Sequence, residues 1–131
     1  MAGGMHLSAP GHTAYGPLLT RLFKEIGKIP SGPGKEMDRL LPALEALFAS
    51  LLRALEKEEP PRDLSLHLEA DEIRVQIDLE VEPVAGEPEP PPLLNPEGAA
   101  MKRLEKAFDE VTSHPHGPGG LKLTLLRHIP C

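Results

Sequence analysis

Three carboxylates alternate along one segment of the chain: Asp78, Glu80 and Glu82. In an extended segment their side chains point to the same side, and each lies about 7 Å from the next. Carboxylates at that spacing can serve acid–base catalysis or bind a divalent cation. They also occupy the polar positions of an amphipathic strand, where solvated charges are expected, and we favour that second interpretation.

Several potential metal ligands gather near the C-terminus, where His114, His116 and His128 precede Cys131. No second pair among them has the close spacing that zinc ligands usually show. Two histidines on either side of a proline, followed by glycines, are typical of a solvated turn. We therefore predict no metal site.

The string Ser31-Gly-Pro-Gly-Lys35 has the composition of a phosphate-binding loop. The full motif needs a glycine where Ile29 stands and a Ser or Thr where Glu36 stands. We interpret the string as a connector between two helices. No serine or cysteine has the flanking residues of a catalytic nucleophile.

These residues must be positioned by elements that the apolar pattern predicts. Residues 16–28 and 35–57 carry apolar side chains at helical spacing, and the second stripe is wide enough for a buried helix. The period then changes to two, which predicts two strands at 64–68 and 73–81 that form an antiparallel hairpin.

The remaining chain begins with a proline-dense segment at 83–96, whose length suggests a functional loop. Residues 97–113 are predicted to form a third helix and residues 114–120 a turn. Residues 121–125 alternate again, which predicts a last strand.

This order of elements predicts an α/β fold of the α+β two-layer type, with three helices covering one face of a mixed, largely antiparallel sheet. A length of 131 residues fits one domain. We expect a flexible N-terminus over residues 1–14 and a single domain over residues 15–131.

Composition excludes several classes of partner. The formal net charge is −6, with three Phe, one Tyr and no Trp, so neither the cationic surface nor the stacking platforms of a nucleic-acid-binding protein are present. No apolar stretch approaches the ~20 residues that a membrane span needs. With one cysteine and no leader pattern, we expect a cytoplasmic protein. The scarcity of Asn and Gln is typical of a thermophilic host.

The layout resembles that of the GHKL ATP-binding fold, and in particular the small anti-sigma-factor serine kinases. The resemblance spans residues 18–126. It is a resemblance of layout, in which the segments 44–50, 73–83, 95–101, 107–111 and 119–125 take the places of family motifs. The strings Asp109-Glu110-Val111 and Gly119-Gly120 support it. It implies nucleotide-binding roles for Glu45 on the long helix, Glu80 at the end of the hairpin and Gly98 in the glycine box.

The sequence departs from that family where nucleotide chemistry needs it most. Ala49 stands where the resemblance implies a magnesium-binding Asn, and it offers no oxygen ligand. Val81 and Pro83 replace glycines that would let the backbone approach a phosphate. A negative charge at Glu80 would repel triphosphate. The resemblance therefore implies a retained fold with nucleotide binding lost, and we expect no cofactor.

The expected function is that of a non-catalytic regulatory protein that binds a protein partner, either a component of a sigma-factor pathway or a second copy of itself. The alternative is a divergent anti-sigma-factor Ser/Thr kinase that uses ATP and Mg²⁺. In that alternative Glu45 is either the catalytic base or a carboxylate beside the metal ion, and residues 83–96 form the lid over the nucleotide.

Overall fold

Five strands and three helices form within the residues that the computed structural model describes, which are 3–29, 32–58, 60–84, 93–95 and 97–129. In chain order they are β1 (Gly3–Ala9), α1 (Tyr15–Ile26), α2 (Lys35–Glu56), β2 (Leu64–Ala70), β3 (Arg74–Val81), α3 (Ala99–Ala107), β4 (Glu110–Pro115) and β5 (Leu121–His128).

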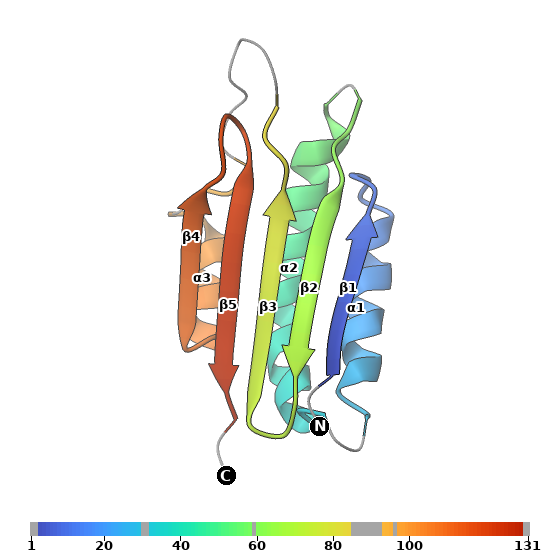
Figure 1. Ribbon diagram of the computed structural model, residues 1–131, viewed down its shortest axis with the longest axis vertical. Helices are drawn as coiled ribbons and strands as arrows, with labels where there is room; N and C mark the ends of the chain where they lie inside the picture. The colour runs from blue at the N-terminus through green and yellow to red at the C-terminus, as the bar shows by residue number, and fades with distance from the viewer. Residues whose placement is uncertain (1–2, 30–31, 59, 85–92, 96, 130–131) are drawn as a thin grey trace.

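The strands make one sheet in the order β1-β2-β3-β5-β4 (Figure 1). Each of its four described strand pairs is antiparallel. The predicted two-layer fold and the predominance of antiparallel pairing are confirmed, and no parallel pair occurs among the described strands. The hairpin predicted from the period-two pattern is β2–β3, with Leu66 opposite Leu79.

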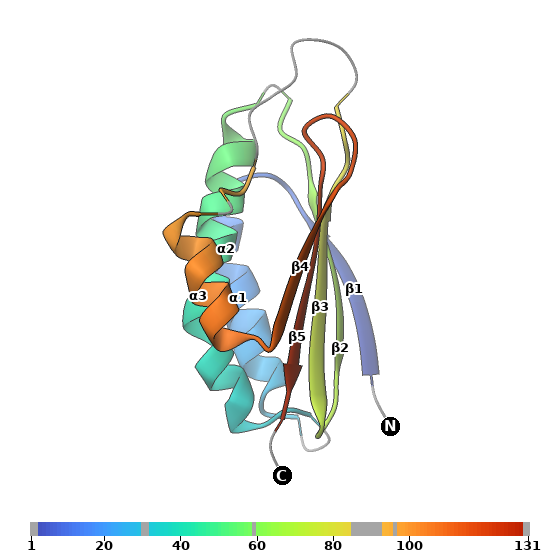
Figure 2. The same cartoon turned by 90° about the vertical axis from the view of Figure 1, so that its left-hand side faces the viewer.

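All three helices cover the same face of the sheet (Figure 2), and α2 packs between α1 and α3 (Figure 1). Alternation along the strands explains this arrangement, because Val75, Ile77, Leu79 and Val81 of β3 are buried toward the helices. The residues between them, such as Asp78 and Glu80, therefore lie on the opposite face, which no described helix covers.

The core is centred on α2, whose apolar stripe is buried as predicted. Leu44, Leu47, Phe48 and Leu51 are fully buried there. Phe23 of α1 stacks on Phe48 with ring centroids 5.6 Å apart, and this contact fixes α1 against α2. Among the described residues, no helix combines the length and the apolar character that crossing a membrane requires.

The N-terminal segment differs from the prediction. Residues 1–14 were expected to be flexible, but Gly3–Ala9 forms β1 and pairs with β2 along its whole length. Met5 and Leu7 pack partly against the core and Ala9 is buried. The inward side chains are few and two glycines begin the strand, so the pairing comes from β2 rather than from strong local preference.

The third helix is shorter than predicted. Residues 97–113 were expected to be helical, yet α3 ends at Ala107 because Phe108 adopts an extended conformation (φ −109°, ψ 148°). Phe108 is buried, and Glu110–Pro115 then forms the edge strand β4. Val111 and Thr112 are β-branched, which favours a strand once β5 offers a partner.

The proline-dense segment at 83–96 lies largely outside the described residues, as does Cys131. At its start, Val84 N donates a hydrogen bond to the carbonyl of Pro118 at 2.9 Å. This bond joins the end of β3 to the β4–β5 turn.

Candidate functional site

A groove of about 660 Å³, which we call the α1–α2 groove, lies on the outer surface of helices α1 and α2. One side is formed by Thr13, by the α1 residues Gly16, Pro17, Thr20, Arg21, Lys24 and Glu25, and by Lys28 in the turn after α1. The other side is formed by Glu45, Ala49 and Arg53 of α2.

Its charge differs from that of the chain as a whole. Arg21, Lys24, Lys28 and Arg53 give four cations against two carboxylates, on a protein whose formal net charge is −6. Lys28 Nζ lies 3.2 Å from Glu25 Oε1, within the groove itself. The other three cations make no ion pair with any residue that the structure describes. The groove is therefore a local concentration of positive charge.

Helical spacing produces this arrangement. Arg21 and Lys24 are three residues apart and share one face of α1, while Leu19, Phe23 and Ile26 face the core. Lys28 follows four residues after Lys24, in the turn that ends the helix. Pro17 is tolerated because it lies in the first turn of the helix, where its missing N–H has no helical acceptor.

The end of the groove near Thr13 is held by contacts to the last turn of α2. Ala14 N donates to His12 Nδ1 at 3.0 Å, so a neutral His12 ring carries its proton on Nε2. That nitrogen lies 3.1 Å from Glu56 Oε1, and the Thr13 hydroxyl lies 3.3 Å from the same carboxylate. These contacts fix the start of α1 against α2.

A second, smaller groove of about 350 Å³ lies on the other side of α2, toward the segment before α3. It is lined by Ala46, Ala49, Ser50, Arg53, Ala54, Lys57 and Leu93. Ala49 and Arg53 line both grooves. Ala49 stands where the family resemblance implies a magnesium-binding Asn, so its side chain offers only a methyl group to both grooves.

The structure does not bring together the three residues singled out for nucleotide binding. Glu45 is exposed on the outer face of α2 and lines the α1–α2 groove. Glu80 lies on β3 and points to the sheet face opposite the helices. Gly98 is the N-cap of α3, where an added Cβ would meet the carbonyl oxygen of Asn95 at 3.2 Å. Because α2 and β3 belong to different layers (Figure 2), Glu45 on the outer face of α2 and Glu80 on the open face of the sheet lie on opposite sides of the protein.

The alternating carboxylates on β3 have different surroundings. Asp78 Oδ1 accepts a hydrogen bond from the Thr124 hydroxyl at 2.8 Å, and Asp78 Oδ2 accepts one from Gln76 at 3.3 Å. Asp78 is thus engaged in cross-strand bonding. Glu80 and Glu82 instead lie beside His116 of the β4–β5 turn.

The other residues considered as metal ligands are dispersed. His114 is exposed on β4, where Lys122 of β5 separates it from Glu80 in the strand register, and it is not part of the group that Glu80, Glu82 and His116 form. His128 is held at the end of β5, where its backbone N–H donates to Asp109 Oδ2 at 2.6 Å.

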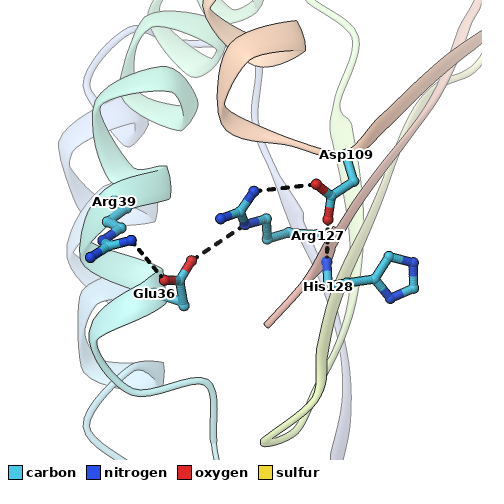
Figure 3. Close-up of polar contacts among 5 residues, drawn as sticks. All are labelled: Glu36, Arg39, Asp109, Arg127 and His128. Carbon is cyan, nitrogen blue, oxygen red and sulfur yellow. Dashed lines mark hydrogen bonds and ion pairs between the residues drawn. The ribbon is translucent and has the colours of Figure 1, made fainter. Parts of the chain in front are cut away.

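A further polar network, shown in Figure 3, was not predicted from the sequence. Arg127 of β5 contacts Glu36 at 3.3 Å and Asp109 at 3.2 Å, and Glu36 also pairs with Arg39 at 3.2 Å. The network ties the first turn of α2 to the sheet. Glu36 and Arg39 are three residues apart, but Asp109 and Arg127 lie far from them in the sequence, so spacing gives no signal for the contacts of Arg127.

Comparison with known proteins gives a structural match but no sequence match. The sequence matches no protein-family model and no curated protein. The fold is similar to the crystal structure of the RsbU and RsbW domains of a Mycobacterium tuberculosis protein, with a TM-score of 0.64 and 12% sequence identity.

The match covers 98% of this chain and 33% of that one, so this chain spans about a third of that structure. At this identity the similarity shows the fold alone. It supports the two-layer α+β architecture predicted from the sequence.

Proposed function

We propose that this chain is a non-catalytic regulatory domain that binds an acidic segment of a partner protein in the α1–α2 groove. The observation that carries the proposal is the cluster of four cations in a groove of an otherwise acidic chain. Clustered cations attract an anionic partner and orient it before contact.

Apolar side chains on the same helix add to this surface. Leu18 is 59% exposed and Tyr15 is 37% exposed on α1. Protein interfaces combine apolar contacts, which supply affinity, with charges around them, which supply specificity. Helix α1 offers both kinds of side chain.

The proposal includes the loss of nucleotide binding. Ala49 supplies no metal ligand, and Glu45 and Glu80 lie on opposite faces, so a nucleotide would not meet the residues that the resemblance implies. The structural neighbour contains RsbU and RsbW domains. With the anti-sigma-factor resemblance, this favours a partner from a sigma-factor pathway, in a cytoplasmic setting.

The alternative function is that of a divergent Ser/Thr kinase. It is favoured by the position of Glu45 in a groove whose cations could hold phosphate groups. In this alternative Glu45 is the base, and ATP with Mg²⁺ fills the groove.

The proposal is tested with the triple variant Arg21→Glu, Lys24→Glu, Lys28→Glu as bait for affinity capture from the source cell, compared with the wild type. A matched control reverses three exposed cations of α3, in Lys102→Glu, Arg103→Glu, Lys106→Glu. Both variants change the charge equally. We expect a partner that the wild type and the α3 variant retain and that the α1 variant loses.

Equal capture by all three baits would contradict the groove as the binding surface. The second copy of the chain is the other candidate occupant. If the wild type sediments as a dimer at micromolar concentration and the α1 variant as a monomer, the groove binds the chain itself.

A further inference from the structure

The open face of the sheet brings three potential metal ligands together at one end of β3. Ligand atoms of Glu80, Glu82 and His116 all lie within 4.8 Å of one another. His116 Nε2 is 3.0 Å from Glu80 Oε1 and 3.7 Å from Glu82 Oε2. The carboxylates alternate on β3 and its extension, while the imidazole comes from the β4–β5 turn.

We propose that Glu80, Glu82 and His116 bind a divalent first-row metal ion, of which Zn²⁺ suits the ligand set best. Imidazole and carboxylate are both common zinc ligands. With metal–ligand bonds of about 2.1 Å and tetrahedral angles, two ligand atoms on one ion lie about 3.4 Å apart. The two separations around His116 Nε2 lie on either side of that value, so small side-chain rotations complete the site.

The state of His116 Nε2 is an independent sign that a ligand belongs there. This atom is buried, although the side chain as a whole is 30% exposed. It makes no hydrogen bond to any residue that the structure describes, and its close contacts are the carboxylate oxygens of Glu80 and Glu82. A ring nitrogen that is buried without a hydrogen bond is costly, and coordination of a cation shared with the two carboxylates would satisfy it.

Among the described residues, no lysine or arginine forms an ion pair with Glu80 or Glu82. Lys122 is opposite Glu80 in the strand register, yet no ion pair joins them. Arg62 is engaged elsewhere, since it pairs with Glu58 at 2.6 Å and donates to the carbonyls of Glu82 and Gly119, each at 2.7 Å. A bound cation would offset the repulsion between Glu80 and Glu82.

The backbone around the site is held in place before any metal binds. The two carbonyls bonded by Arg62 belong to the carboxylate-bearing segment and to the turn that carries His116. The turn depends on Gly117, which has a φ of +72° and packs so closely that an added Cβ would lie 2.7 Å from Pro83. Figure 1 shows the turn beside the end of β3. Such preorganisation lowers the cost of binding.

The test is titration of the metal-free protein with Zn²⁺ by calorimetry, together with thermal melting. We expect one Zn²⁺ per chain and a higher melting temperature, since the ion binds the folded state. Glu80→Gln and His116→Ala should each weaken binding at least tenfold. His114→Ala is the matched control, because His114 lies on the same hairpin outside the cluster, and its Zn²⁺ affinity should equal that of the wild type.

Substituting Co²⁺ gives a second readout, since its visible spectrum reports coordination by imidazole and should change in His116→Ala but not in His114→Ala. The melting temperatures of the metal-free variants show whether each one folds. The proposal is overturned if the wild type takes up no Zn²⁺ at millimolar concentration, or if His114→Ala weakens binding as much as His116→Ala.

Discussion

Arg127 is a single residue that connects the two layers. Its guanidinium lies 3.3 Å from Glu36 of α2 and 3.2 Å from Asp109 at the start of β4, and 24% of its side chain is exposed (Figure 3). Glu36 is 12% exposed, so losing Arg127 would leave a largely buried carboxylate with a weaker partner. We expect Arg127→Met to lower the free energy of unfolding by about 1–3 kcal/mol, measured by urea denaturation.

The matched control for that prediction is Arg39→Met. Arg39 contacts the same carboxylate at 3.2 Å, but its side chain is 73% exposed and its ion pair is screened by water. We expect a change within about 0.5 kcal/mol. Equal losses in the two variants would contradict the idea that burial decides the strength of this network.

Residue types alone could reveal part of the two sites. The alternation of Glu80 and Glu82 predicts that they share one face of the strand, and in the structure their carboxylates do lie close together beside His116. His116 could not be assigned to them, because its approach depends on a turn from another hairpin and on the contacts of Arg62. The cations of α1 are visible as a polar helical face, but Arg53 joins them only through the packing of α1 on α2.

At the scale of elements, helices and strands with a strongly periodic apolar pattern are predicted well from the sequence. Strands that form only because a neighbouring strand pairs with them are predicted poorly. The long helix α2 and the strands β2, β3 and β5 follow from their apolar patterns. Strands β1 and β4 do not, because both are edge strands with few buried side chains. Leading into β4, the apolar positions Leu104, Phe108 and Val111 also fit a continuing helix, and only β5 decides between the two.

Pairing with β2 makes a prediction for β1. Half of the amides of Gly3–Ala9 should exchange with deuterium slowly, since an edge strand bonds one neighbour with alternate N–H groups. Leu7→Asn should speed this exchange because Leu7 packs partly against the core. Ser8→Asn, on the exposed side of the strand, should leave it unchanged. Uniformly fast exchange in the wild type would mean that the segment is flexible after all.

At the scale of the whole molecule, the two layers separate two kinds of surface. The helical side carries the cationic α1–α2 groove, and the open sheet face carries Glu80, Glu82 and His116. Of the residues to which the family resemblance gives nucleotide-binding roles, Glu45 lies on the helical side and Glu80 on the open sheet face. The fold is thus shared with a larger protein that contains an RsbW domain, while the groups around Ala49 differ from those the family resemblance implies.

This arrangement leads to a prediction for ATP. A nucleotide that binds the folded state and is present at 100 times its dissociation constant would stabilise that state by about 2.7 kcal/mol. Such a stabilisation raises the melting temperature of a domain of this size by on the order of 10 °C. We expect no rise with millimolar Mg-ATP. Ala49→Asn, which restores the implied magnesium ligand, should also show none, because Glu80 remains on the opposite face. A rise in the wild type would favour the kinase alternative, and a rise only in Ala49→Asn would identify the missing Asn as the sole cause of the loss.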